Sequence, residues 1–110
     1  MSETPKPVVG GLYAARGEDG LYRITKVLVV DDFAVHLRLY ANQFKELPSK
    51  ISSAELSMGR LGSPGGFGIG HFPIAKEGFG QDNSVLIAQE PVRDDELEGY
   101  RIWAGIDPIE

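Results

Sequence analysis

The sequence predicts a mainly β fold of the α+β class, in which a small antiparallel barrel or curved meander sheet carries a glycine-rich loop and a C-terminal helix. Three observations predict it. Residues 8–44 hold three apolar segments joined by two tight-turn signals. The segment Ala34–Tyr40 alternates apolar and polar side chains with the period of two that is typical of a strand. Residues 94–104 repeat apolar side chains at helical spacing.

Turn chemistry supports the meander. Asp19-Gly20 predicts the first hairpin, because glycine adopts positive φ without steric cost. Asp31-Asp32 predicts the second turn, although it has no glycine. The run Val27–Val30 is apolar on both faces, which predicts either double coverage or a bulge at the end of the second strand.

The third strand has the clearest faces. Val35, Leu37 and Leu39 are expected to point into the core. His36 and Arg38 lie on the opposite face and are expected to be exposed to solvent, because a register slip of one residue would exchange the two faces.

The second half of the chain is less regular. Residues 41–59 are expected to form a long connection, and the glycines between Gly59 and Gly70 predict a loop. Phe72–Phe79 is expected to hold a short helix with Pro73 in its first turn. Ser84–Gln89 is a short apolar segment that predicts a further strand.

The predicted C-terminal helix covers residues 94–104. Asp94 or Asp95 can cap its start. Gly99 weakens it by about 1 kcal/mol relative to alanine. Leu97, Tyr100, Trp103 and Ala104 share one face, so Trp103 is expected to be mostly buried.

Length and composition limit the class. The 110 residues are sufficient for one domain, expected over residues 8–110 after a disordered lead-in of residues 1–7. The sequence has no cysteine, no apolar run approaching the ~18 residues of a membrane span and no signal peptide, which favours a cytoplasmic protein. A net charge of −5 disfavours a nucleic-acid interface, because phosphate contacts need clustered lysine and arginine.

His71 is the best single candidate for chemistry. It follows Gly68-Ile69-Gly70, but that segment lacks the third glycine of a dinucleotide fingerprint and the lysine of a phosphate-binding loop. The other histidine, His36, lies far away in the sequence, so no metal site and no cofactor are expected. Without a visible nucleophile or orienting group, His71 is expected not to be catalytic.

A recognition surface is the more specific expectation. Tyrosine, histidine and arginine together combine aromatic area with directional donors. The candidate partner-binding residues are His36, Arg38, Tyr40, Asn42, Phe44 and His71. The alternative is that Tyr40 packs under the following loop while its neighbours are solvated.

Three meandering strands with a later short strand resemble the SH3-like and Tudor-like small barrels, in which residues 84–89 would supply the closing strand. The segment Val9–Tyr13, the strand beginning Gly20–Arg23 and the acidic composition are also similar to small uncharacterised bacterial proteins, some of which are toxin-immunity proteins. The resemblance to immunity proteins implies an acidic surface that covers the active site of a toxin.

Three functions therefore remain open. The first is a non-enzymatic module that binds another protein, including an immunity or inhibitor protein. The second is a small enzyme that uses His71 beside the glycine-rich loop. The third is a purely structural or accessory role, and a nucleic-acid binder is the least favoured class.

Overall fold

The computed structural model describes residues 7–32, 34–48, 51–52, 56, 68–79 and 84–105. Apart from Pro7, the predicted lead-in lies outside these residues, and so do residues 59–67 of the loop predicted between Gly59 and Gly70. The last two residues of that predicted loop, Ile69 and Gly70, belong to a strand.

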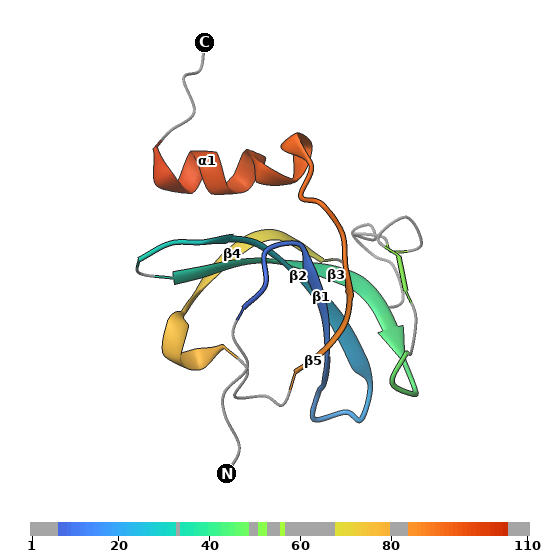
Figure 1. The fold of residues 1–110 in the computed structure, drawn as a ribbon. Helices are drawn as coiled ribbons and strands as arrows, with labels where there is room; N and C mark the ends of the chain where they lie inside the picture. The colour runs from blue at the N-terminus through green and yellow to red at the C-terminus, as the bar shows by residue number, and fades with distance from the viewer. Residues whose placement is uncertain are drawn as a thin grey trace.

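Five antiparallel strands form one sheet in the order β4-β3-β2-β1-β5 (Figure 1). They are β1 (Gly11–Arg16), β2 (Tyr22–Val30), β3 (Ala34–Phe44), β4 (Ile69–Ala75) and β5 (Val85–Gln89). The first three form the predicted meander. Because β4 and β5 lie at opposite edges, the sheet is open, and β5 extends it beyond β1 where a closing strand was predicted.

The two hairpin turns use different chemistry. Gly20 has a φ of 84°, which confirms the reason for a glycine in the first turn. In the second turn a carboxylate replaces the glycine. The Ala34 N–H donates to Asp31 Oδ1 at 2.8 Å, and the Asp31 N–H donates to the Ala34 carbonyl at 3.1 Å. Asp31 thereby closes the turn between β2 and β3.

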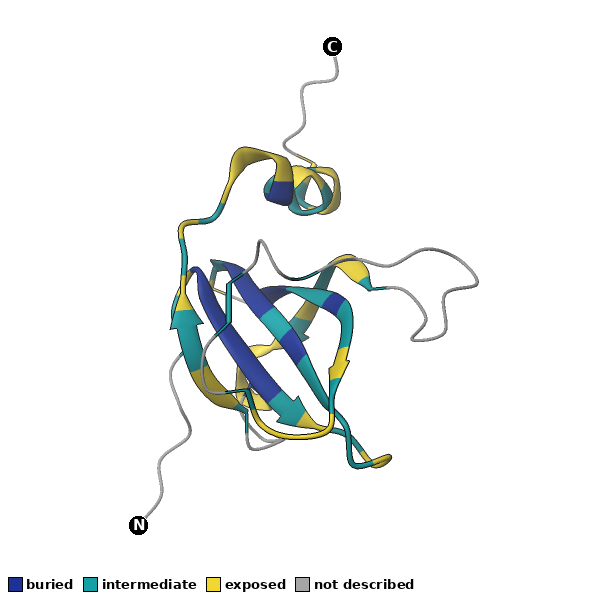
Figure 2. Ribbon diagram, turned by 90° about the vertical axis from the view of Figure 1, so that its right-hand side faces the viewer, coloured by how far each residue is buried: buried dark blue, intermediate teal, exposed yellow. Residues whose placement is uncertain are grey.

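Each face of the sheet buries its own apolar cluster. One cluster consists of Tyr13, Val27, Val35, Leu37 and Phe79. The other consists of Leu12, Ala14, Ile24 and Tyr40. Successive residues of β1 belong to different clusters, so the clusters lie on opposite faces. Figure 2 shows the buried residues concentrated in the strands.

Register irregularities bend the two central strands. Val27 pairs with Leu37 whereas Val29 pairs with His36, so Leu28 is the additional residue of a bulge. Val27 and Leu28 are both buried. The bulge predicted as one of two alternatives for this run is confirmed. The bend contributes to the curvature of the sheet in Figure 1.

The predicted helix over residues 72–79 is wrong. The strand β4 covers its first half, and the 3₁₀ turn η2 (Lys76–Gly78) follows. Pro73 is compatible with β4 because this strand lies at the sheet edge, where a missing N–H donor is tolerated. Ile69 is exposed at the start of β4.

The predicted C-terminal helix is present in two parts, the 3₁₀ helix η3 (Asp94–Leu97) and the helix α1 (Glu98–Ala104). The α1 helix lies across one face of the sheet (Figure 1). It ends at Gly105, whose φ is 71°. Within the described part of the chain, no helix is long and apolar enough to cross a membrane.

Candidate binding site between the sheet and α1

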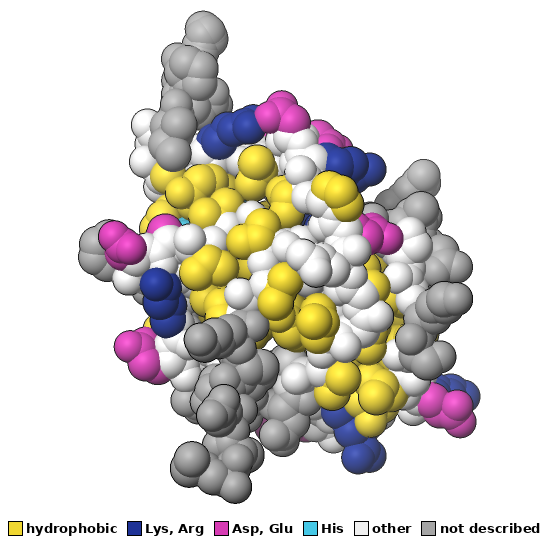
Figure 3. Space-filling model, viewed as in Figure 1, with side chains coloured by type: hydrophobic (Ala, Val, Ile, Leu, Met, Phe, Trp, Pro, Cys, Tyr) yellow, Lys and Arg dark blue, Asp and Glu magenta, His cyan; other side chains and the backbone are white. Residues whose placement is uncertain are grey.

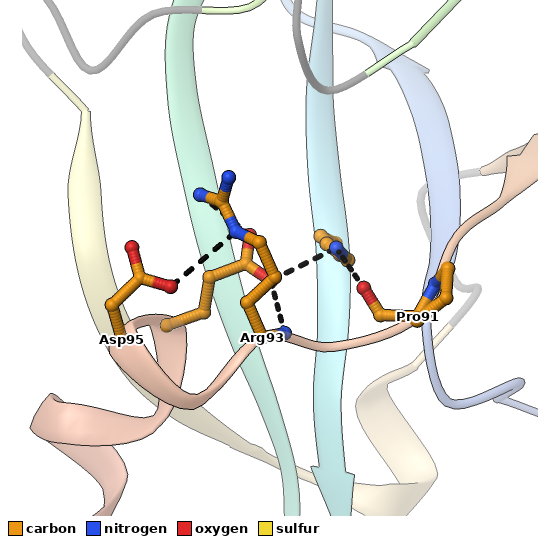
Figure 4. Close-up of polar contacts among 5 residues, drawn as sticks. Pro91, Arg93 and Asp95 are labelled. Atoms are coloured by element: carbon orange, nitrogen blue, oxygen red, sulfur yellow. Dashed lines mark hydrogen bonds and ion pairs between the residues drawn. The ribbon is translucent and has the colours of Figure 1, made fainter.

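A buried ion pair fastens the C-terminal segment to the sheet (Figure 4). Lys26, in the middle of β2, donates from Nζ to Glu96 Oε1 and to the Pro91 carbonyl, each at 2.9 Å. Both charged side chains are 1% exposed. Glu96 Oε1 also accepts the Arg93 N–H at 2.9 Å, which caps η3. Burial acts to raise the pKa of Glu96, but the Arg93 N–H and Lys26 together hold it below its usual value.

A chain of three hydrogen-bonded side chains lies farther along the same face. His36 comes from β3, His71 from β4 and Asp31 from the turn before β3. His36 Nε2 lies 2.8 Å from Asp31 Oδ2, and His36 Nδ1 lies 2.9 Å from His71 Nε2. We call Asp31, His36 and His71 the histidine chain.

The donors and acceptors available on each group determine the direction of the hydrogen bonds in the histidine chain. An ionised Asp31 only accepts, so His36 must donate through Nε2–H. In an uncharged His36 ring Nδ1 is then an acceptor, and His71 must donate through Nε2–H. The remaining lone pair of an uncharged His71 lies on Nδ1, for which the described residues supply no partner. This order is inferred from the donor and acceptor sets of the three groups.

The α1 helix covers the histidine chain with aromatic rings. The His36 ring centroid lies 4.7 Å from that of Tyr100 and 4.6 Å from that of Trp103. As a result His36 has no exposed surface. Gly99 faces His71 so closely that a Cβ there would lie 2.6 Å from His71 Cβ. The glycine that weakens the helix is therefore the residue that lets α1 approach β4.

An open cleft of about 390 Å³ lies beside this contact. Its sheet wall is formed by Arg38, Gly70 and His71. Its helical wall is formed by Asp95, Glu96, Glu98, Gly99 and Ile102. Burial, and secondly the neighbouring His36, lower the pKa of His71. His71 is therefore held in the form that accepts a proton or a hydrogen bond at neutral pH.

The predicted recognition face is not an exposed surface. His36 is fully buried under α1, and Tyr40 is 5% exposed within the second apolar cluster. Burial raises the pKa of Tyr40 to about 12. Ile51 and Leu56 pack against the cluster that contains Tyr40. The alternative interpretation therefore agrees with the structure for Tyr40 but is wrong for His36, which is not solvated. The alternation of side chains on β3 was predicted correctly, but both faces of the strand are covered by other parts of the protein.

Other predicted residues divide into two groups. Arg38 and His71 lie together at the cleft, whereas Asn42 and Phe44 lie farther along β3, where Phe44 packs on the second cluster. The expectation that His71 has no orienting group is wrong, because His36 and Asp31 support it. Among the described residues, no group of three ligating side chains could hold a metal ion.

The sequence analysis missed Asp31, Glu96 and Tyr100 as parts of the site. The one available signal was Lys26, a charged residue among apolar neighbours on β2, which indicates a buried partner. Trp103 was predicted to be mostly buried but is 51% exposed, because only one side of its ring packs on His36. Ile102, beside it, is 64% exposed.

Comparison of the chain with protein-family models, with curated proteins and with solved structures gives no match.

Proposed function

We propose that this protein is a non-enzymatic binding module that docks onto a basic surface of another protein, in the manner of an immunity or inhibitor protein. The docking surface would be the helix face, defined as Asp94, Asp95, Glu98, Ile102 and Trp103. The observation that carries the proposal is the exposure of Trp103 and Ile102 next to acidic side chains.

Apolar side chains on the helix face supply the affinity in this proposal. Trp103 is anchored on one side by the His36 ring and leaves about half of its surface, 51%, for a partner. An anchored aromatic ring loses little conformational entropy on binding, and tryptophan is enriched among the residues that dominate interface energies. Figure 3 shows hydrophobic side chains next to charged ones along this segment.

Acidic side chains on the helix face supply the specificity. Asp94 and Asp95 have side chains that are 86% and 71% exposed, and Glu98 is also exposed. Asp94 is paired with Arg101 and Asp95 with Arg93, so Glu98 and the net charge of −5 are what attract a basic partner and accelerate its association. A toxin whose active site is basic would present the complementary surface.

Titration with a purified partner tests this proposal. Cross-linking in extracts of the native host, from a reactive group placed at Ile102, identifies the partner to be purified. Trp103→Ala should then weaken binding about tenfold or more, and Glu98→Lys should weaken it while reducing its dependence on salt. The matched control is Leu86→Ala, since Leu86 on β5 is similarly exposed, at 46%, but lies outside the helix face.

The proposal is contradicted if Leu86→Ala weakens the complex and Trp103→Ala does not. Circular dichroism of both variants distinguishes a lost contact from a lost fold.

A second candidate function rests on the histidine chain. Asp31 and His36 orient His71 as the partners of a general base do, and His71 borders an open cleft. The described residues of that cleft include no hydroxyl or thiol side chain, so His71 would activate water. The reaction class would then be hydrolysis of an activated ester, a phosphate ester or a peptide.

A hydrolysis screen separates the two candidates. The binding proposal expects no turnover by the wild-type protein beyond that of His71→Gln. An enzyme would lose turnover with His71→Gln while keeping its circular dichroism spectrum. Its rate would fall only below about pH 6.5, the usual pKa of histidine, because the pKa of His71 is lowered and a base acts when deprotonated.

A further inference from the structure

Arg38 is a cation that the described residues leave without a counter-ion. It lies on the sheet wall of the cleft between β3 and α1. Its Nε is buried and has no hydrogen-bond partner among the described residues, and none of their ion pairs includes Arg38. A guanidinium is a planar fork of donors that matches a carboxylate, so an unused one at a cleft points to an anionic ligand group.

The opposite wall of the cleft carries negative charge. Glu98 has no ion-pair partner among the described residues, and Asp95 is paired only with the exposed Arg93, at 3.3 Å. The third carboxylate of this wall, Glu96, is already occupied by Lys26 and the Arg93 N–H. Asp95 and Glu98 are therefore available to a cationic ligand group.

Opposite charges on two walls select against singly charged ligands. A simple anion bound to Arg38 is repelled by Asp95 and Glu98, and a simple cation bound to these carboxylates is repelled by Arg38. A molecule that carries both charges satisfies both walls. His71 adds a neutral acceptor, since its lowered pKa keeps a lone pair available on the ring.

We propose that this cleft binds a small zwitterion, a free amino acid, with its carboxylate on Arg38 and its ammonium group on Asp95 and Glu98. The volume of about 390 Å³ is near the lower end of the range of ligand pockets. Gly70 contributes no side chain, and a Cβ at this position would meet nothing within 4 Å. Ile102 offers apolar contact to the carbon chain of the ligand. The cleft shares Asp95, Glu98 and Ile102 with the helix face, but its ligand is a small molecule and its sheet wall, with Arg38, lies outside that face.

Nuclear magnetic resonance titration of the full chain tests it. The amide signals of Gly70 and Gly99 report on opposite walls of the cleft. The probes are glycine, β-alanine, γ-aminobutyrate and lysine, which separate the carboxylate and the ammonium group by different lengths. At least one of them should shift both signals in a saturable manner. Its N-acetylated and its carboxamide forms should each bind about tenfold or more weakly, because each lacks one charge.

Variants separate binding from folding. Arg38→Leu should abolish the shifts without lowering the free energy of unfolding, because the guanidinium it removes has no partner among the described residues. Arg16→Leu, at the exposed end of β1, is the matched control and should bind as the wild type does. If Arg38→Leu does not fold, Gly70→Leu serves in its place, since the added side chain enters open space and obstructs the cleft.

Three results would overturn the proposal. They are the absence of saturable shifts with all four probes, binding of acetate or methylammonium as tight as that of the best amino acid, and unchanged binding by Arg38→Leu. None of them decides the partner titration, in which Trp103 and Glu98 are varied and Arg38 is not.

Discussion

Replacing Lys26 with methionine should lower the free energy of unfolding by about 3–5 kcal/mol, the largest effect expected in this protein. Methionine keeps most of the volume of the lysine but leaves the carboxylate of Glu96 buried without its cation. Both side chains are 1% exposed, so solvent cannot replace the lost partner. Urea denaturation measures the loss. The emission of Trp103, the single tryptophan, reports whether the helix leaves the sheet.

The double variant Lys26→Met with Glu96→Leu is the control for this prediction. It removes both charges, so it should recover most of the stability that Lys26→Met loses. The exposed pair of Arg23 and Asp19 gives the comparison on the surface, where Arg23→Met should cost less than about 1 kcal/mol. Equal losses from Lys26→Met and Arg23→Met would show that the Lys26–Glu96 pair is not buried in solution.

The second large effect is expected from His36→Ala, which should lower the free energy of unfolding by about 2–4 kcal/mol. The substitution opens a cavity under Tyr100 and Trp103 and removes the ring that joins Asp31 to His71. Because α1 packs on this ring, Trp103 should become more accessible, and its quenching by acrylamide should increase.

Two further variants apportion that loss. His36→Phe keeps a ring against α1 but loses both nitrogen contacts. Its free energy of unfolding should therefore lie between those of the wild type and His36→Ala. His71→Ala should cost less than His36→Ala, since His71 is only half-buried. A loss below about 1 kcal/mol for His36→Ala would mean that the helix does not depend on this ring.

The fold could be predicted from the sequence wherever local chemistry decided it. Gly20 and Asp31 mark turns whose geometry depends on their own residue types, and the alternation along β3 assigns its side chains to the correct faces. The coverage of these faces is a long-range property. His36 is buried because a helix from the far end of the chain lies on it, and no pattern within β3 contains that information.

Long-range packing also decides the structure of β4 and of the site, for which the predictions were wrong. Pro73 resembles the first turn of a helix in the sequence, and only the edge position of β4 makes it compatible with a strand. His36 and His71 are 35 residues apart in sequence. The pairing of β3 with β4 brings them together, with His36 Nδ1 2.9 Å from His71 Nε2. Helical spacing placed Trp103 on the same helix face as Leu97 and Tyr100. Spacing does not predict how much of the indole ring the sheet covers.

In this structure α1 packs on an ordered chain of hydrogen bonds from Asp31 through His36 to His71. Nitrogen-15 magnetic resonance of the two imidazole rings tests it most directly. The structure predicts slowly exchanging Nε2–H protons on both rings, a coupling across the hydrogen bond from His71 Nε2–H to His36 Nδ1, and nuclear Overhauser contacts between His36 and the Trp103 indole. Rapid exchange of both imidazole protons with water, without contacts to Trp103, would contradict it.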